Sequence, residues 1–327
     1  MESELKRRTF CMMATLGAFT WPGIAASQTY PSRPIQLIVG FPPGSATDFI
    51  ARLIAPKMAE GLGQPVVVEN RPGASGVVAA TAVSNAAPDG YTIMVTVPGS
   101  ITTAKVMLKE KLQYSPQTDL VPIGLIGRSP LLLVVKADSG MKSVAELTAL
   151  AKATSGGMSV GSYGVGSPSH FAVETLRVQS KLPIVHVPFN GSGALQTALL
   201  GGVIPAAVDS LTAVLPFLDG RRIVALAVTS PQRIDVLPNV PTTTESGLGP
   251  IELGGWAGLH GPKGTSANVV RVINAEMNRV LALPEIRNQL KSRLLIVGGA
   301  PSVFETYIKT ETELVTRIVQ EARLTFE

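Results

Sequence analysis

Short apolar runs alternate with helical patterns along this chain, and that alternation restricts its fold more than any other feature. The apolar runs predict buried strands at Ile35–Phe41, Val66–Glu69, Tyr91–Val97, Leu131–Val135, Met158–Ser162, Ile184–Phe189, Ala206–Val208, Ile223–Thr229 and Leu294–Val297. Helices are predicted between or after them at Thr47–Glu60, Gly76–Ala86, Ser143–Ala153, Ser169–Gln179, Ala194–Leu200, Ser266–Leu281 and Ser302–Val319. Alternating strands and helices predict an α/β protein with parallel sheets.

The length of 327 residues exceeds what one hydrophobic core usually organises, so we expect two lobes. Hydrophobic residues make up 45% of the chain and charged residues 16%, which excludes a disordered chain. The net charge is +5, but the basic residues are scattered and aromatic residues are only 5%. A nucleic-acid surface needs a concentrated basic stripe, so we expect no nucleic-acid partner.

The N-terminus has the order of a secretory signal peptide. Lys6, Arg7 and Arg8 precede an uncharged stretch, which small residues at 25–27 then end. We therefore expect residues 1–27 to be a signal peptide, cleaved near residues 26–28, and the protein to be periplasmic. The Arg7–Arg8 pair also resembles a twin-arginine signal, so the export route stays open. Cys11, the single cysteine, lies in this segment, which leaves no disulfide, catalytic thiol or cysteine metal site afterwards.

The first predicted helix contains a proline. Pro56 removes a backbone donor, so we expect a kink or an early end there, and Gly61 and Gly63 to stop the helix.

The turn from Gly40 to Asp48 joins the first strand to this helix. Backbone N–H groups at a helix start lack helical partners and carry partial positive charge. Gly44 allows close approach, and Ser45 and Thr47 add hydroxyls, so an anion is well placed here. A capping box of Ser45 and Asp48 without a ligand explains the spacing equally well. It is not a phosphate-binding P-loop, because Gly-Lys-Ser/Thr is missing.

Other loops repeat this design after later strands. They are Pro98–Ser100, Gly161–His170 and Phe189–Gly193, all rich in glycine and hydroxyls. Ligands of open α/β sheets collect outside the carboxyl ends of strands, so these loops are expected to converge on one cleft. His170 fits a local hydrogen-bonding role or that of a base.

Enzyme motifs are largely missing. The chain has no Gly-x-Ser-x-Gly elbow and no His-Glu-x-x-His motif. His170, His186 and His260 are widely separated in the sequence, which argues against a histidine metal cluster. Spacing alone permits a hydrolase that uses His170 with Asp209, but no local turn supports it. We expect a binding protein without cofactor or metal.

Several ordered motifs together resemble one family. They are Tyr30–Ile35, Phe41–Gly44 with Thr47–Asp48, Val66–Ala74, Pro88–Thr92, Ser169–His170, Val185–Pro188, Ala225–Ser230, Pro238–Thr242 and Trp256–Leu259. With these segments the chain resembles the tripartite tricarboxylate transporter receptors, the Bug-type (UPF0065-like) periplasmic solute-binding proteins. The resemblance covers essentially the whole chain after the signal peptide.

The resemblance implies a two-lobed type II periplasmic-binding-protein fold, each lobe a mostly parallel sheet flanked by helices, with a cleft between them. We expect residues 28–126 plus 252–327 to form one lobe and residues 127–251 the other. Such a receptor captures a small carboxylate and delivers it to a transporter of large and small membrane subunits. We expect it to act as a monomer.

The loop after the third strand contributes Gly99 and Ser100 to the expected ligand-binding residues, and the family pattern implies the others. Together they are Phe41, Gly44, Ser45, Ala46, Thr47, Asp48, Gly99, Ser100, Ser167, Ser169, His170, Phe189, Asn190, Gly191, Ser192 and Asp209.

This chain departs from the family pattern in the loops. Ser45 replaces a usual glycine, Phe189–Gly191 reads Phe-Asn-Gly where Tyr-Lys-Gly is common, and Pro205 stands where an acidic residue is frequent. The lost cation leaves the ligand open among mono-, di- and tricarboxylates, aromatic acids included. A ligand sensor for a membrane signalling partner and a periplasmic hydrolase or isomerase remain alternative functions.

Overall fold

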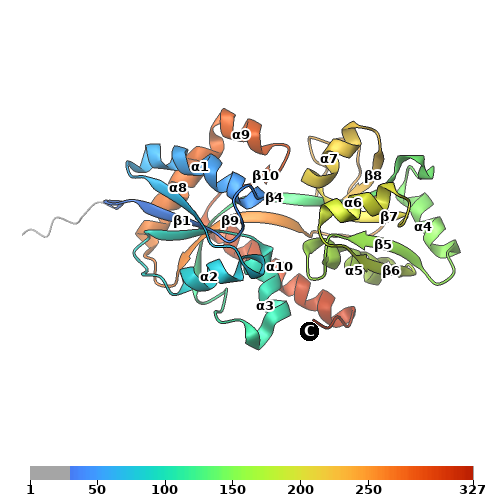
Figure 1. Ribbon diagram of the computed structural model, residues 1–327, viewed down its shortest axis with the longest axis horizontal. Coiled ribbons are helices and arrows are strands. Elements are labelled where there is room, and N and C mark those ends of the chain that lie inside the picture. The colour runs from blue at the N-terminus through green and yellow to red at the C-terminus, as the bar shows by residue number, and fades with distance from the viewer. Residues whose placement is uncertain (1–29, 327) are drawn as a thin grey trace, which may run out of the picture.

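The computed structural model describes residues 30–326 and shows two lobes side by side (Figure 1); the predicted signal peptide lies outside this range. The strands are β1 Ile35–Val39, β2 Val66–Asn70, β3 Thr92–Thr96, β4 Leu120–Lys136, β5 Met158–Ser162, β6 Ile184–Pro188, β7 Ala206–Ser210, β8 Ile223–Val228, β9 Gly254–Pro262 and β10 Leu295–Ile296.

Helices cover these strands on both sides. They are α1 Ala46–Leu62, α2 Val77–Ser84, α3 Thr102–Leu108, α4 Val144–Ala153, α5 Pro168–Ser180, α6 Ser192–Leu200, α7 Leu211–Asp219, α8 Ala267–Ala282, α9 Pro284–Leu290 and α10 Pro301–Glu321. Two short 3-10 turns matter for the site, η1 Ala74–Gly76 and η2 Pro98–Ser100. Within residues 30–326, none of the helices combines the length and the apolar character that a membrane span requires.

The first lobe is built on β2, β1 and β3, which are parallel, followed by β9 and the beginning of β4. β9 runs antiparallel to both β3 and β4, because the chain enters it on its way back from the other lobe. The second lobe is built on β6, β5 and β7, which are parallel, with the end of β4 antiparallel to β7 and β8. The expected two-lobed α/β fold is confirmed, with mixed strand directions where the lobes meet.

Strand β4 and helix α10 join the lobes. β4 pairs with β9 along its first part and with β7 and β8 along its last part, so a single strand belongs to both sheets. Helix α10 runs below the junction in the view of Figure 1: Phe304 and Ile308 pack in the first lobe, whereas Val315, Ile318 and Val319 pack in the core of the second. The lobe boundaries drawn from the sequence stay a prediction.

Helix α1 continues through Pro56 to Leu62, so the early end predicted at that proline is wrong. Its buried face, which includes Ile50, Ile54 and Met58, packs against apolar residues of α8. This packing retains the helical path although one backbone donor is missing. Gly63, at φ 67°, then ends the helix as its left-handed C-cap.

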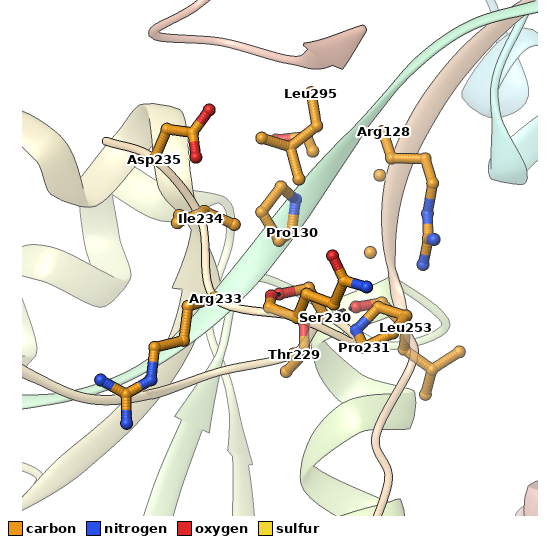
Figure 2. A pocket seen from close by; sticks show the side chains of 14 residues that line it. Arg128, Pro130, Thr229, Ser230, Pro231, Arg233, Ile234, Asp235, Leu253 and Leu295 are labelled. Atoms are coloured by element: carbon orange, nitrogen blue, oxygen red, sulfur yellow. Dashed lines mark hydrogen bonds between the residues drawn. The ribbon is translucent and has the colours of Figure 1, made fainter. Parts of the chain in front are cut away.

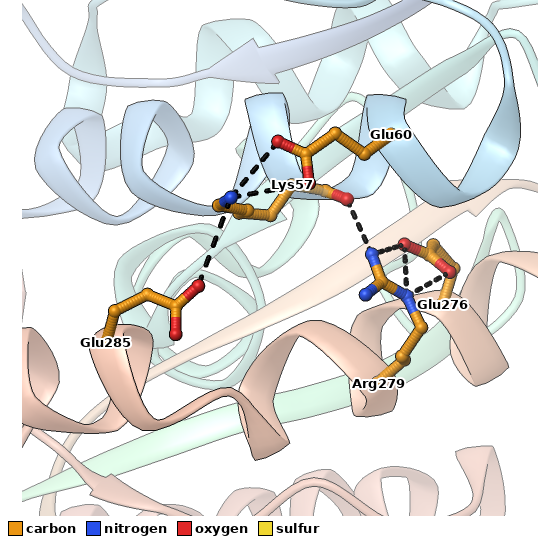
Figure 3. Close-up of polar contacts among 5 residues, drawn as sticks. All are labelled: Lys57, Glu60, Glu276, Arg279 and Glu285. Carbon is orange, nitrogen blue, oxygen red and sulfur yellow. Dashed lines mark hydrogen bonds and ion pairs between the residues drawn. The ribbon is translucent and has the colours of Figure 1, made fainter.

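Polar contacts fix α1 to α8 and α9 (Figure 3). Lys57 Nζ lies 3.9 Å from Glu285 of α9, and Arg279 Nη2 of α8 donates to the Lys57 carbonyl at 2.8 Å. Lys57 also pairs with Glu60 of its own helix at 3.1 Å. Exposed ion pairs contribute little individually, so apolar packing carries most of the attachment. Together they fix the direction of α1, whose first turn borders the other lobe.

Candidate functional site: a cleft between the lobes

The start of α1 keeps unpaired donors. Ser45 is its N-cap, and the Ser45 hydroxyl accepts the Asp48 N–H at 3.2 Å. Within residues 30–326 the N–H groups of Ala46 and Thr47 have no hydrogen-bond partner, and neither has the Thr47 hydroxyl. Thr47 is only 8% exposed as a residue, and its hydroxyl is accessible rather than sealed in, so a solvent molecule or a ligand can reach it.

Asp48 turns inward and supports the loop. Its carboxylate accepts the Gly44 N–H at 2.9 Å, the Arg52 Nε at 2.9 Å and the Asn70 amide at 2.8 Å. The same Asn70 amide donates to the Phe41 carbonyl. Chiefly the hydrogen bond from Arg52 lowers the pKa of Asp48 to about 2. The Ser45 half of the capping box is present, and Asp48 closes the loop through Gly44 instead.

The free donors open into a small cavity of about 150 Å³, here called the helix-end cavity. It is lined by Ala46, Thr47, Ile50, Val97, Ser129, Thr212, Gly255, Trp256, Ala257, Arg293 and Leu294. Thr212 belongs to the second lobe, so the cavity lies between the lobes. The Arg293 guanidinium stacks 4.3 Å from the centre of the Phe49 ring, and no carboxylate among the described residues pairs with it.

A larger cavity of about 600 Å³, here called the cleft cavity, adjoins the first and shares Val97, Gly255 and Trp256 with it. It is lined by Phe41, Ala74, Ser75, Val77, Val97, Pro98, Gly99, Thr103, Ala104, Met107, Leu108, Tyr163, Gly164, Val165, Gly166, Ser167, Pro168, Gly255 and Trp256. This volume is typical of small-molecule sites. Loops that follow β1, β3 and β5 meet here, as expected from the sequence, whereas the fourth expected loop, Phe189–Gly193, does not line this cavity.

One wall of the cleft cavity is a strained turn. Ala74 and Ser75 in η1 adopt positive φ angles of 45° and 55°, which are uncommon for residues with a side chain. Gly99 leaves room for this turn, because a Cβ there would lie 2.8 Å from the Ser75 carbonyl oxygen. Strained backbone of this kind concentrates at ligand sites.

The loop from the second lobe is held by its own serines and His170. Ser167 is the N-cap of α5 and its hydroxyl donates to the Gly164 carbonyl at 2.6 Å. The Gly166 N–H donates to His170 Nδ1 at 2.9 Å. Ser169 is buried, and its hydroxyl donates to the Val208 carbonyl inside the lobe rather than pointing to the cavity between the lobes.

Asp209 is likewise buried, and its role is local. Its carboxylate accepts hydrogen bonds from Ser192 at 2.6 Å, Gln196 at 2.8 Å and the Ser210 N–H at 2.7 Å. Burial raises the pKa of Asp209, and these hydrogen bonds oppose that rise. In residues 30–326 Asp209 and His170 share no hydrogen bond, so the hydrolase arrangement considered from spacing does not form.

The predicted site residues therefore fall into two groups. Phe41, Gly99 and Ser167 line the cleft cavity, and Ala46 and Thr47 line the helix-end cavity. The remainder border neither cavity: Gly44, Ser45, Asp48, Ser100, Ser169, His170, Phe189, Asn190, Gly191, Ser192 and Asp209. Sequence reasoning missed Trp256, Ser75 and Arg293 as lining residues; only Trp256 stood in a motif that could have drawn attention to its side chain.

The chain matches a family model described as "Tripartite tricarboxylate transporter family receptor" over residues 50–324. It belongs to this family.

A curated relative, a UPF0065 protein of a tcbD-tcbE intergenic region in Pseudomonas sp. (strain P51), is 37% identical over 297 residues, covering 90% of this chain and 88% of the relative. A solved R. palustris protein with adipate is 30% identical, with a TM-score of 0.77, covering 91% of this chain and 100% of the other. MatC from Rhodopseudomonas palustris with bound malate is 33% identical, with a TM-score of 0.72, covering 89% and 100%. Family members are periplasmic solute-binding receptors rather than enzymes.

In this receptor a further cavity, of about 360 Å³, lies beside the strands that join the lobes. Figure 2 shows Arg128 and Pro130 of β4 on one side and Arg233 and Asp235 of the segment after β8 on the other. None of the predicted site residues lines it. The unpaired donors of α1 open into the helix-end cavity instead.

Two histidines of this receptor meet in the second lobe although their sequence separation did not indicate it. The rings of His170 and His186 stack with centroids 4.2 Å apart and planes 14° apart, and Glu174 lies beside them. A metal ion lies in the plane of each imidazole that binds it, about 2 Å from the nitrogen, so two nearly parallel rings do not share one ion. Glu174 also pairs with Arg177 at 2.7 Å, and the arrangement favours a packing role.

Acid is expected to destabilise this fold. Burial, the first cause in each case, lowers the pKa of His170 and His186 to about 4 and that of His260 to about 3. A histidine with a lowered folded pKa contributes stability above pH 6.5 and loses it as pH falls toward the folded value. Glu311, whose pKa burial raises to about 7, acts in the opposite direction. Asp209, whose pKa burial also raises, acts in the same direction as Glu311. The three histidines outnumber these two carboxyl groups, so the unfolding free energy should fall from pH 7 to pH 5, by about 2 kcal/mol.

Urea unfolding followed by circular dichroism measures this fall in the unfolding free energy. Equal stability at pH 7 and pH 5 would contradict the prediction.

Proposed function

We propose that this chain is the soluble receptor that captures a small organic carboxylate between its lobes and delivers it to a transporter of large and small membrane subunits. The observation that carries the proposal is the start of α1. Unpaired backbone donors and the unpaired hydroxyl of Thr47 open there into a cavity that both lobes line. Relatives with bound adipate and malate support a carboxylate ligand.

The carboxylate would accept hydrogen bonds from the Ala46 and Thr47 N–H groups and from the Thr47 hydroxyl, near the positive end of the helix dipole. Hydrogen bonds to a charged group contribute about 1.5–3 kcal/mol each, so three approach the roughly 8 kcal/mol of a micromolar site. The solute would favour a closed form because it contacts both lobes at once. We also infer export by the N-terminal signal peptide, a periplasmic location and a monomeric state.

Calorimetry of the protein against a panel of carboxylates tests the proposal. At least one acid should bind with a micromolar dissociation constant, and Thr47→Val should weaken it at least about tenfold, because the hydroxyl is lost without a change of shape. Thr316→Val, a matched change whose hydroxyl bonds the Thr312 carbonyl of its own helix, should leave affinity unchanged. Failure of every acid to bind the folded protein below millimolar concentration would overturn the proposal.

A further inference from the structure

The walls of the cleft cavity carry no charge. Its lining residues include three aromatic side chains, Phe41, Tyr163 and Trp256, and aliphatic ones such as Met107 and Leu108. Its polar lining side chains are Ser75, Thr103, Ser167 and Tyr163, and it has no Lys, Arg, Asp, Glu or His. A solute carboxylate placed here would lose water without gaining a cation, which is costly.

The charged lining residue of the two cavities lies at the helix-end cavity. In the helix-end cavity Arg293 is the single ionisable lining residue, and it stacks on the Phe49 ring. The stacked guanidinium is held in place, and it pairs with no described carboxylate. The Thr47 hydroxyl, on a residue 8% exposed, also lacks a partner among residues 30–326. The Arg293 guanidinium and the Thr47 hydroxyl are independent of the helix dipole, and both indicate that an anion binds in the helix-end cavity.

The sizes of the two cavities agree with this division. The helix-end cavity, at about 150 Å³, has room for a carboxylate group but little more, whereas the cleft cavity offers about 600 Å³. They meet at Val97, Gly255 and Trp256, so one molecule can occupy both. The indole of Trp256 lies where the charged end of such a molecule would join its body.

The geometry points to a monocarboxylate with an aromatic or similarly large apolar body as the solute. Its carboxylate binds between Arg293 and the start of α1, and its body packs against Trp256, Phe41 and Tyr163. This inference rests on the proposed function and names the solute class of that same site. Arg293 supplies the cation that the Phe-Asn-Gly loop at Phe189–Gly191 lacks.

Competitive calorimetry with benzoate, phenylacetate and 3-phenylpropionate against acetate, adipate and malate tests the solute class. At least one phenyl acid should bind about tenfold or more tightly than every other acid, because its ring buries apolar surface without a second charge. Arg293→Gln should weaken that acid at least about tenfold. Arg271→Gln, an exposed arginine that bonds Asn268, is the matched control and should leave the affinity unchanged.

A specificity swap gives a second readout. Leu108→Arg places a cation in the cleft cavity and should shift the preference toward adipate. Tight binding of adipate or malate to the unaltered protein, with weaker phenyl acids, would overturn this inference and leave the proposed function standing. Unchanged affinity in Arg293→Gln would overturn the placement of the carboxylate. If no acid binds, both the inference and the proposed function fail.

Discussion

Asp48→Ala is expected to lower the free energy of unfolding by about 2–4 kcal/mol, because it removes a buried acceptor that several donors share. The Gly44 N–H and the Asn70 amide lose their partner, and Arg52 loses its ion pair at 2.9 Å. Ligand affinity should fall as well, through loosening of the turn before α1. Urea unfolding and calorimetry on the same variant measure both effects.

Asp138→Ala is the matched control, because the Asp138 side chain is 68% exposed and its ion pair among residues 30–326 is with Lys136 on the surface. Its effect on stability should stay below about 0.5 kcal/mol. A variant Asp48→Ala with unchanged stability and abolished binding would show that Asp48 contacts the ligand directly, against the inward geometry described above.

Trp256→Phe is expected to lower the free energy of unfolding by about 2–3 kcal/mol at pH 8 and by clearly less at pH 5.5. Trp256 Nε1 donates to Glu311 Oε2 at 2.7 Å in the interior of the protein. Glu311 lies near the middle of α10. Glu311 is 4% exposed, and burial raises its pKa to about 7. At pH 8 the Glu311 carboxylate is charged, so removing the indole N–H leaves a buried charge without that donor. At pH 5.5 the Glu311 carboxyl is neutral, so the same change lowers the free energy of unfolding by less.

The Glu311→Gln background supplies the control, because an amide does not titrate. There the cost of Trp256→Phe, measured by urea unfolding, should be the same at both pH values. An equal cost at pH 8 and pH 5.5 in the original background would show that the Trp256–Glu311 contact is not what holds the indole.

The local part of the fold was predictable from sequence, and the part that joins the lobes was not. Strands β1, β3 and β8 are mainly apolar runs whose residues are mostly buried, so pattern and structure agree. β9 was missed because its glycines are typical of a loop. Its Gly258 is needed because a Cβ there would lie 2.2 Å from the Phe304 ring, a contact between segments far apart in sequence. β4 was predicted only at Leu131–Val135, because Pro122, Gly124 and Pro130 interrupt the apolar pattern of its first part and are typical of loops.

The site followed the same division. The loops after β1, β3 and β5 were found because hydroxyls and glycines at a strand end are a local signal. The direction of each side chain could not be predicted, because it depends on partners distant in sequence. Asp48 is held by Asn70, and Ser169 donates to the Val208 carbonyl. Arg293 follows α9 in a segment without any motif, and only the folded chain brings it near Thr47.

A crystal structure of the protein with the tightest-binding acid of the panel tests the central claim most directly. We expect one carboxylate oxygen within about 3 Å of the Ala46 or Thr47 backbone nitrogen, with the body of the acid in the cleft cavity. An acid bound in the cavity beside Arg128 and Arg233, or with its carboxylate away from α1, would contradict the account.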